Sequence, residues 1–238
     1  MTQTDDSKRR QIQEDASAER RLLEAAEELF ADKGFDAVSL REITARAGTN
    51  IAAVNYYFRS REKLIQAVIK RHVKPVNDER LERLKKLERR GEATVEEIVD
   101  AFMRPFVTRV KSSELSERMF LKLMGRMFGE SRELFPEAVM EQFGGLMERF
   151  RRAFSKALPG VPDETLYWRI HFMTGATIHT MAHWDLLHRI TQGRCGSPEP
   201  EQVLSRCIRF VAAGMREGAS ENPSAEQAPQ KELDLFGE

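Results

Sequence analysis

Cysteine and long apolar runs are both scarce in this sequence of 238 residues. The two cysteines, Cys195 and Cys207, form no CxxC pair and lack the spacing of zinc ligands, so we expect reduced thiols without a redox role. No apolar run approaches the roughly 20 residues that a membrane-spanning helix needs, and the N-terminus is too polar for a secretory signal. We therefore expect a soluble, cytoplasmic protein without a membrane partner.

The sequence also lacks the motifs of common enzyme classes. It contains no HExxH, no glycine-rich phosphate loop and no Ser/His/Asp arrangement typical of a hydrolase. The strongest candidates for a metal site are His179, His183 and His188, of which the first two are one helical turn apart. The third lies about 140° round the helix from His183, so one helix cannot present all three to a metal ion. We expect no catalytic activity, no metal and no cofactor.

Charge is balanced in total but not along the chain. The 38 basic and 38 acidic residues give a formal net charge of zero. Residues 41–74 contain eight Lys and Arg against two Glu, whereas residues 217–238 contain one Lys against six Asp and Glu. A polyanion such as DNA would therefore bind the N-terminal third and be repelled by the C-terminal end.

The first 75 residues carry the signals of four helices. Apolar residues follow helical spacing over residues 22–30, and Gly34 supplies a C-terminal stop. Ser39 stands three residues before Glu42, which is the pattern of a capping box at the start of a second helix that Gly48 ends. The second helix is expected to be only about nine residues long.

A third helix capped by Asn50 and a fourth beginning near Ser60 complete this region. Two short helices joined by a glycine-containing turn, behind a longer supporting helix, indicate a helix-turn-helix motif. In the alternative interpretation, the tyrosines pack against the first helix and the cations only solvate the surface. The glycine turn and the two caps together favour DNA binding, through the polar side chains of Asn55, Tyr56, Tyr57, Arg61 and Lys63.

The stretch RRLLEAAEELFADKGFDAVSLREITARAGTNIAAVNYYFRSREKLI, within residues 18–70, resembles the DNA-binding domain of the TetR family of bacterial transcriptional regulators. It combines the LF…GF, S/T…I…AG and YxF…K/R…L landmarks of that family. The resemblance implies a homodimer that places two recognition helices about 34–36 Å apart on a palindromic operator in double-stranded DNA. With the polar face above, it gives ten candidate DNA contacts: Ser39, Arg41, Thr49, Asn50, Ile51, Asn55, Tyr56, Tyr57, Arg61 and Lys63.

Residues 76–218 are helical by the same criteria, with helices predicted near 95–110, 119–128, 136–158, 164–190 and 201–218. Nine of the ten methionines lie between residues 103 and 215. Flexible thioethers and aromatic rings suit either a deformable ligand cavity or an ordinary core, and composition alone favours the core.

Three short segments, NIAAVNYYF, WRIHFMTGA and FVAAGMR, resemble the PsrA-like branch of TetR regulators, whose known ligands are long-chain fatty acids or their derivatives. This resemblance implies a repressor of lipid metabolism that a small hydrophobic effector, a fatty acid or acyl-CoA, releases from DNA. The resemblance to the TetR family implies that the last two helices pair with their copies in a dimer. The candidate ligand-binding residues are Met103, Phe106, Met124, Phe128, Phe150, Trp168, His171, Phe172, Gly175 and His179.

We thus expect an all-α protein: a disordered N-terminal arm (1–15), a TetR-type helix-turn-helix domain (16–75), a helical effector-binding and dimerisation domain (76–218) and a disordered acidic tail (219–238). The tail contains QKELDLF, which resembles the short peptide that bacterial proteins offer to the replication sliding clamp. This leaves an alternative open, in which the DNA-binding protein has a protein partner through its tail and no small-molecule effector. In either case the protein is expected on the nucleoid.

Overall fold

The computed structural model describes residues 3–112, 117–129, 135–196 and 199–217, and it places the side chains of residues 17–109, 119–126, 143–180, 183, 186–196 and 199–217. All regular secondary structure in these ranges is helical, which confirms the expected all-α fold. The acidic tail with its QKELDLF segment and the side chain of Phe128 lie outside the described part of the chain. Within that part, no helix has both the length and the apolarity needed to cross a bilayer.

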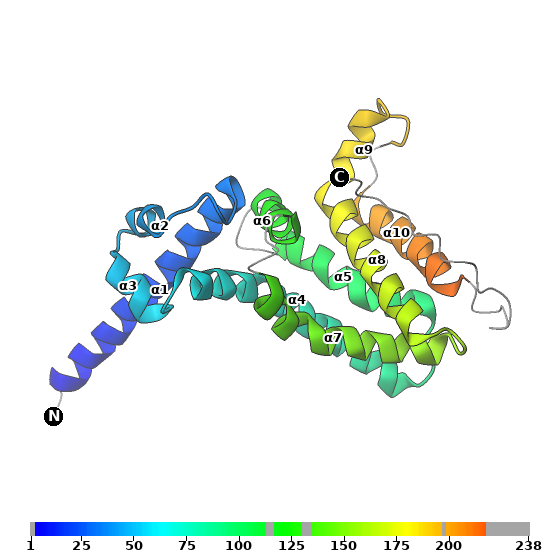
Figure 1. Ribbon diagram of the computed structural model, residues 1–238, viewed down its shortest axis with the longest axis horizontal. Helices are drawn as coiled ribbons and strands as arrows, with labels where there is room; N and C mark the ends of the chain where they lie inside the picture. Colours follow the sequence, from blue (N-terminus) through cyan, green and yellow to red (C-terminus); the bar gives the residue numbers. More distant parts are fainter. Residues whose placement is uncertain (1–2, 113–116, 130–134, 197–198, 218–238) are drawn as a thin grey trace, which may run out of the picture.

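The N-terminal domain consists of α1 (Gln3–Lys33), α2 (Leu40–Ala47), α3 (Ile51–Tyr57) and the first half of α4 (Arg61–Arg90), at the left of Figure 1. Residues 3–15, expected to form a disordered arm, continue α1 in the structure; no glycine or proline interrupts residues 3–33. Each helix turns apolar side chains toward one core, whose fully buried members include Leu22, Phe30, Ile43, Val54 and Leu64.

Helix α2 begins and ends, and helix α3 begins, where the sequence predicts. The Ser39 hydroxyl accepts a hydrogen bond from the backbone N–H of Glu42 (3.3 Å), and the Glu42 carboxylate accepts one from the backbone N–H of Ser39 (2.9 Å). Gly48 ends α2 in the left-handed conformation (φ 62°), which a residue with a side chain rarely adopts. The Asn50 side chain then accepts from the N–H of Ala53 (3.0 Å) and starts α3. The two caps and the glycine therefore fix the angle between α2 and α3.

Glu42 is also held by Lys33 at the end of α1, with 2.8 Å between Lys33 Nζ and Glu42 Oε1. Hydrogen bonds from Lys33 first, and from Ser39 second, lower the pKa of Glu42 from its ordinary 4.5 to about 2. A carboxylate with a lowered pKa stabilises the fold above its unfolded pKa. We therefore expect this contribution to be complete above pH 4.5 and to disappear as the pH falls toward 2.

Replacing Ser39 by alanine should lower the free energy of unfolding by about 1 kcal/mol, because the N–H of Glu42 loses its partner at the helix start. Urea-induced unfolding followed by circular dichroism measures this change. Ser39→Thr keeps the hydroxyl and serves as the control. Equal stability of Ser39→Ala and the wild type would show that the cap does not stabilise α2.

The C-terminal domain is built around the second half of α4, which runs without a break through Pro75 and past the expected boundary at residue 75. Helix α4 packs against α5 and α7, and α10 packs against α5 and α8, to the right in Figure 1. The single helix expected at 164–190 is divided, because α8 ends at Ala182 and α9 follows after His183. The helices of this domain are α5 (Val95–Ser112), α6 (Glu117–Gly129), α7 (Phe135–Ala157), α8 (Asp163–Ala182), α9 (Trp184–Ile190) and α10 (Pro200–Arg216).

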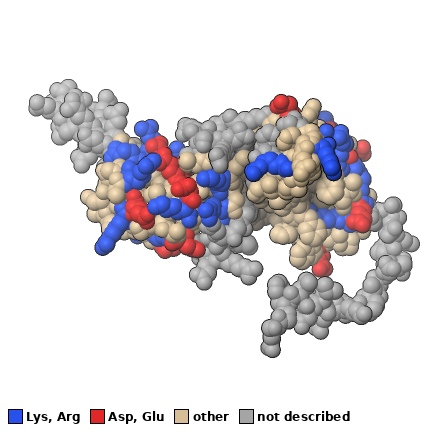
Figure 2. Space-filling view, turned by 90° about the horizontal axis from the view of Figure 1, so that it is seen from above, with Lys and Arg blue, Asp and Glu red and all other residues tan. Residues whose placement is uncertain are grey.

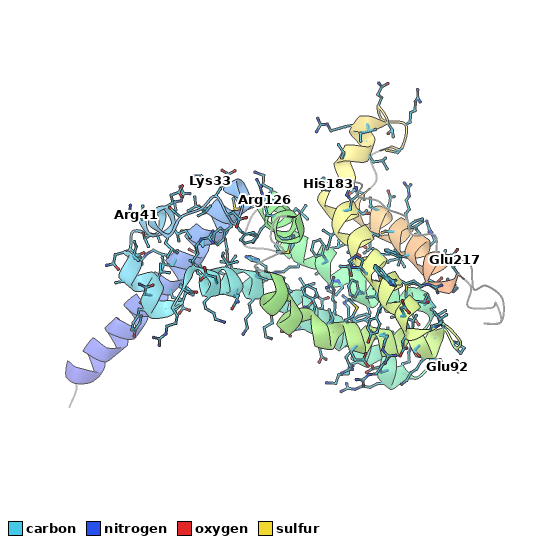
Figure 3. All side chains as sticks on the ribbon, in the orientation of Figure 1. Lys33, Arg41, Glu92, Arg126, His183 and Glu217 are labelled. Atoms are coloured by element: carbon cyan, nitrogen blue, oxygen red, sulfur yellow. The ribbon has the colours of Figure 1, made fainter. Side chains whose placement is uncertain are left out.

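The two domains touch through α1 and α6 as well as through the shared helix α4. Arg126 of α6 donates to the backbone carbonyl of Asp32 (3.2 Å), and the Lys122 ammonium lies 3.5 Å from the Asp32 carboxylate. Figure 3 shows Arg126 close to Lys33 at the end of α1. The helix-turn-helix is thus attached to the C-terminal domain at two places, so a movement of α4 or α6 would carry it along.

Candidate nucleic-acid interface

Helix α3 presents a polar face to solvent on the outside of the N-terminal domain. Asn50, which caps the helix, and Asn55 are both exposed, while Val54 between them is fully buried. The side chains of Ile51 and Tyr56 are 41% and 69% exposed. A seven-residue helix with this exposed face has the size and the hydrogen-bonding groups to enter a DNA major groove.

The two tyrosines of α3 lie in different environments. Tyr57 is partly buried against the core, and its ring meets that of Tyr56 edge-on, with centroids 4.9 Å apart. Tyr56 projects into solvent beyond it. The alternative interpretation, in which the tyrosines pack inward, therefore applies in part to Tyr57 and does not apply to Tyr56. The hydroxyl of Tyr56 is available to a phosphate.

Helix α2 contributes a cation beside α3. Arg41 lies in the first turn of α2 and is exposed, and its guanidinium has no hydrogen bond or ion pair with any described residue. Figure 3 shows it on the outer side of α2, away from the C-terminal domain. Ser39, at the start of the same helix, is also near the surface, but its hydroxyl already serves the capping box. Arg41 is therefore the freer of the two groups for contact with DNA.

Two other candidates are held by the protein itself. The Arg61 guanidinium donates to the backbone carbonyls of Phe35 and Val38, which ties the start of α4 to the turn before α2. The hydroxyl of Thr49 is buried and has no hydrogen-bond partner within the described residues. In this conformation Arg61 orients the motif, and the Thr49 hydroxyl lies at the turn without facing solvent.

The positive charge that faces outward is smaller than the sequence window indicates. Three of its eight cations form ion pairs with acidic residues, namely Arg46 with Glu28, Arg71 with Glu27 and Lys74 with Asp78. Figure 2 shows Lys and Arg on this domain, at the left, interspersed with Asp and Glu.

Near the exposed faces of α2 and α3, three cations have no acidic partner within the described residues: Arg41, Arg59 and Lys63. Arg59 was not among the candidate contacts. It is exposed at the turn between α3 and α4 with a positive φ of 70°, a conformation that is uncommon for a residue with a side chain. Lys63 follows in the first turn of α4, whose N-terminal N–H groups attract anions.

Two family profiles match the chain. Residues 22–68 match "Bacterial regulatory proteins, tetR family" and residues 100–214 match "Tetracyclin repressor-like, C-terminal domain", so the two matches cover both structural domains. The chain belongs to the TetR family. No curated protein matches it in sequence.

Solved structures agree with this TetR assignment at the level of the fold. GusR of Salmonella enterica has a TM-score of 0.58 at 16% identity, over 84% of this chain and 95% of that one. A TetR family regulator from Marinobacter aquaeolei VT8 has a TM-score of 0.58 at 18% identity, over 84% and 96%. HlyIIR, a hemolysin II transcriptional regulator, has a TM-score of 0.56 at 19% identity, over 83% and 98%. As a TetR family member, the protein is a DNA-binding transcriptional regulator and not an enzyme.

Replacing Arg41 by alanine should weaken operator binding by about 1–3 kcal/mol and relax base preference at one position of each half-site, if Arg41 contacts a base. Tyr56→Phe, which deletes only a hydroxyl, should cost about 1 kcal/mol without changing base preference. Fluorescence anisotropy with operator variants measures both effects. Arg89→Ala, at the far end of α4, is the matched control. Wild-type affinity in Arg41→Ala and in Tyr56→Phe would reject both roles.

The structure separates the candidate ligand-binding residues into two groups. Four of them are buried inside the C-terminal domain: Met103, Phe106, Met124 and Phe150. Phe106 and Met124 line a small cavity beside α4, which we name the α4 cavity. Its wall includes His72, Val76 and Arg80 of α4, Phe106 of α5, Met124 of α6 and Phe143 of α7.

The other group lies on the outer surface of α8 and does not reach the α4 cavity. Trp168 and Phe172 are 57% and 63% exposed, and their ring centroids lie 6.0 Å apart. His171, Gly175 and His179 are on the outside of the same helix. Helix α8 is apolar nearly all the way round, so periodicity could not indicate which of its faces lies inside.

The polar wall of the α4 cavity is the part of the site that the sequence analysis missed. His72, Asn77 and Arg80 are each 5% exposed or less. Arg80 occupies a position in the series Ile69, Val73, Val76, Arg80, Leu84, which is otherwise apolar and helical in spacing. A charged residue within an otherwise apolar, buried stripe is the sequence signal that could have identified this part of the site.

His72 also contacts helix α1 of the DNA-binding domain. Its Nε2 lies 3.1 Å from Oε1 of Glu27 on α1, and both side chains are buried. This distance is within ion-pair range, yet the angles are not those of a hydrogen bond, and His72 Nδ1 has no hydrogen-bond partner within the described residues either. Buried polar atoms without hydrogen bonds are rare, and each one lowers the stability of the fold. A conformation that gives these atoms hydrogen-bond partners could therefore replace this contact between α1 and α4 at little cost in free energy.

Proposed function

We propose that the protein is a homodimeric repressor that binds a palindromic operator and leaves it when a hydrophobic effector enters the C-terminal domain. The observation that carries the proposal is an exposed aromatic surface on α8 and α10, the α8–α10 face. It comprises Trp168 and Phe172 of α8 and Phe210 of α10, which is 76% exposed.

A second copy of the chain is the partner that best explains the α8–α10 face. Exposed clusters of large apolar side chains such as Trp168 and Phe172 mark protein–protein interfaces, and most homo-oligomers pair identical patches about a twofold axis. Gly175 on α8 and Gly214 on α10 are exposed, and a methyl group at either position would meet no neighbouring residue within 4 Å. Helices of two subunits can approach closely where glycines face each other. The resulting dimer would carry two copies of α3 on one side of the DNA.

The effector would bind in the α4 cavity, which the apolar side chains of Val76, Phe106, Met124 and Phe143 enclose on several sides. The cavity has a volume of about 20 Å³ for a water-sized sphere, which is room for roughly one water molecule. An acyl chain therefore requires the cavity to widen, and flexible methionines such as Met124 make that inexpensive. Each buried methylene would stabilise the complex by about 0.8 kcal/mol, which favours a long-chain fatty acid or acyl-CoA.

Release of DNA would follow from a difference in affinity. An effector shifts the dimer only if it binds one conformation better than the other. Widening of the α4 cavity displaces α4, and α4 carries the helix-turn-helix and the Glu27–His72 contact with it. The distance between the two copies of α3 would then no longer match the operator.

The experiment is a competition between operator and lipid. The full-length protein is bound to its operator, located by footprinting upstream of its own gene, and titrated with dodecanoic, palmitic and oleic acids and with palmitoyl-CoA. Native mass spectrometry of the purified protein detects lipid that it carries from the cell. We expect micromolar release by at least one of these compounds. Stable complexes with every lipid, together with lipid-free protein, would refute the lipid effector.

A further inference from the structure

Arg80 has an unusual environment for an arginine. Its side chain is 5% exposed, in the wall of the α4 cavity. Nε donates to the backbone carbonyl of Phe102 (2.7 Å), Nη1 donates to the side-chain oxygen of Asn77 (3.1 Å), and the guanidinium lies 3.9 Å from the centroid of the Phe102 ring. All of these partners are neutral. No carboxylate of the described residues lies within 4 Å of this buried charge.

A buried cation without an anion is costly, because the protein removes its water without replacing the lost charge stabilisation. The effect is visible in the pKa of Arg80, which burial lowers to about 9, so the group remains charged at neutral pH. The buried carboxylate at the domain junction, that of Glu27, is engaged by His72 and Arg71 on the α1 side of α4. The neutral contacts orient the guanidinium and leave N–H groups at Nη1 and Nη2 for an anion from outside.

The rest of the cavity indicates what kind of anion would fit. Val76, Phe106 and Met124 form an apolar wall next to Arg80. His72 lies eight residues away, or about 12 Å along α4, and its Nδ1 is buried without a hydrogen-bond partner among the described residues. The cavity thus has a cationic end, an apolar middle and an unsatisfied imidazole at the other end. This spatial order of groups along the cavity suits an elongated molecule with one charged end.

We propose that the effector is a free carboxylic acid whose carboxylate binds Arg80 inside the α4 cavity. This inference rests on the effector site proposed above and narrows its ligand class. A carboxylate offers two oxygens to the planar guanidinium and supplies the negative charge that the described residues do not provide. A thioester or methyl ester has the same chain but no charge at that end, so it leaves Arg80 uncompensated. The inference therefore favours the free acid over acyl-CoA.

The test compares dodecanoic acid with its methyl ester on the full-length protein, by calorimetric titration and by release of labelled operator. A charge-assisted hydrogen bond to a buried group predicts that the wild type binds the acid about 10- to 100-fold more tightly than the ester. Arg80→Met removes the charge and keeps an unbranched apolar stem; it should bind both compounds with the affinity that the wild type has for the ester. Arg83→Met, on the same helix but paired with Glu79 outside the cavity, should retain the preference for the acid.

Equal binding of acid and ester by the wild type, or an unchanged preference in Arg80→Met, would overturn the assignment of Arg80 while leaving a hydrophobic effector in place. If neither lipid binds, the lipid effector is refuted, and the charged subsite is judged with phenylacetic acid against phenylacetamide. A preference for that acid in the wild type, lost in Arg80→Met, would support the subsite without the lipid. Equal or absent binding of this second pair would refute it as well.

Discussion

Replacing Phe172 by glutamate should convert the protein from a dimer into monomers. Phe172 is 63% exposed in the single chain, so the substitution leaves the fold intact, but in the proposed dimer it would bury two uncompensated charges about the twofold axis. Central aromatic residues of interfaces are each worth about 2–4 kcal/mol, so we expect the dimer dissociation constant to rise at least about 1,000-fold. Analytical ultracentrifugation at micromolar concentration measures the change.

Operator affinity should fall together with the dimer. Linking two DNA-binding modules typically raises affinity about 100- to 10,000-fold over one module, and a monomer loses this gain. Phe210→Glu on α10 should behave in the same way, whereas Lys156→Glu, near the end of α7, should change neither property. A Phe172→Glu protein that remains dimeric would show that the α8–α10 face is not the interface.

The second large effect is the dependence of DNA affinity on salt concentration. Each subunit presents three cations without acidic partners among the described residues at the DNA-binding surface, Arg41, Arg59 and Lys63, so a dimer would bring six positive charges against the DNA. Counterion release then predicts a slope of about −5 in a plot of log affinity against log salt concentration, or roughly a 1,000-fold loss between ~50 and ~200 mM salt. Fluorescence anisotropy over this range gives the slope.

Removing one of these cations tests the same prediction residue by residue. Arg59→Ala should reduce the slope by about 2, since each dimer loses two phosphate contacts. Arg46→Ala is the matched control, because Arg46 is paired with Glu28 and should contribute little. A slope near zero for the wild type would contradict an electrostatic DNA-binding surface here.

The N-terminal domain could be predicted closely because its signals are local. Ser39, Gly48, Asn50 and Ser60 each mark a helix end through a hydrogen bond or a backbone conformation within three residues. Local sequence patterns could not show which cations lack a partner within the protein. Arg61 reaches carbonyls more than 20 residues earlier in the chain, and no pattern around it indicates that acceptor.

The C-terminal domain could be predicted as helical, but its interior could not. On α8, Ile170 and Met173 point into the core while Trp168 and Phe172 point outward, and all four are apolar. The hydrophobic effect does not distinguish an apolar face that packs against a second subunit from one that packs within the chain. Which face of α8 is buried depends on where α10 packs, and that position depends on the whole fold.

The most direct test of the account is a selection of binding sites from a random duplex library with the full-length protein, followed by native mass spectrometry of the complex. We predict an inverted repeat whose half-site centres lie one helical turn apart, about 34–36 Å, or a multiple of it, bound by two chains. A single unpaired half-site bound by one chain, or no enriched sequence at low salt, would contradict it.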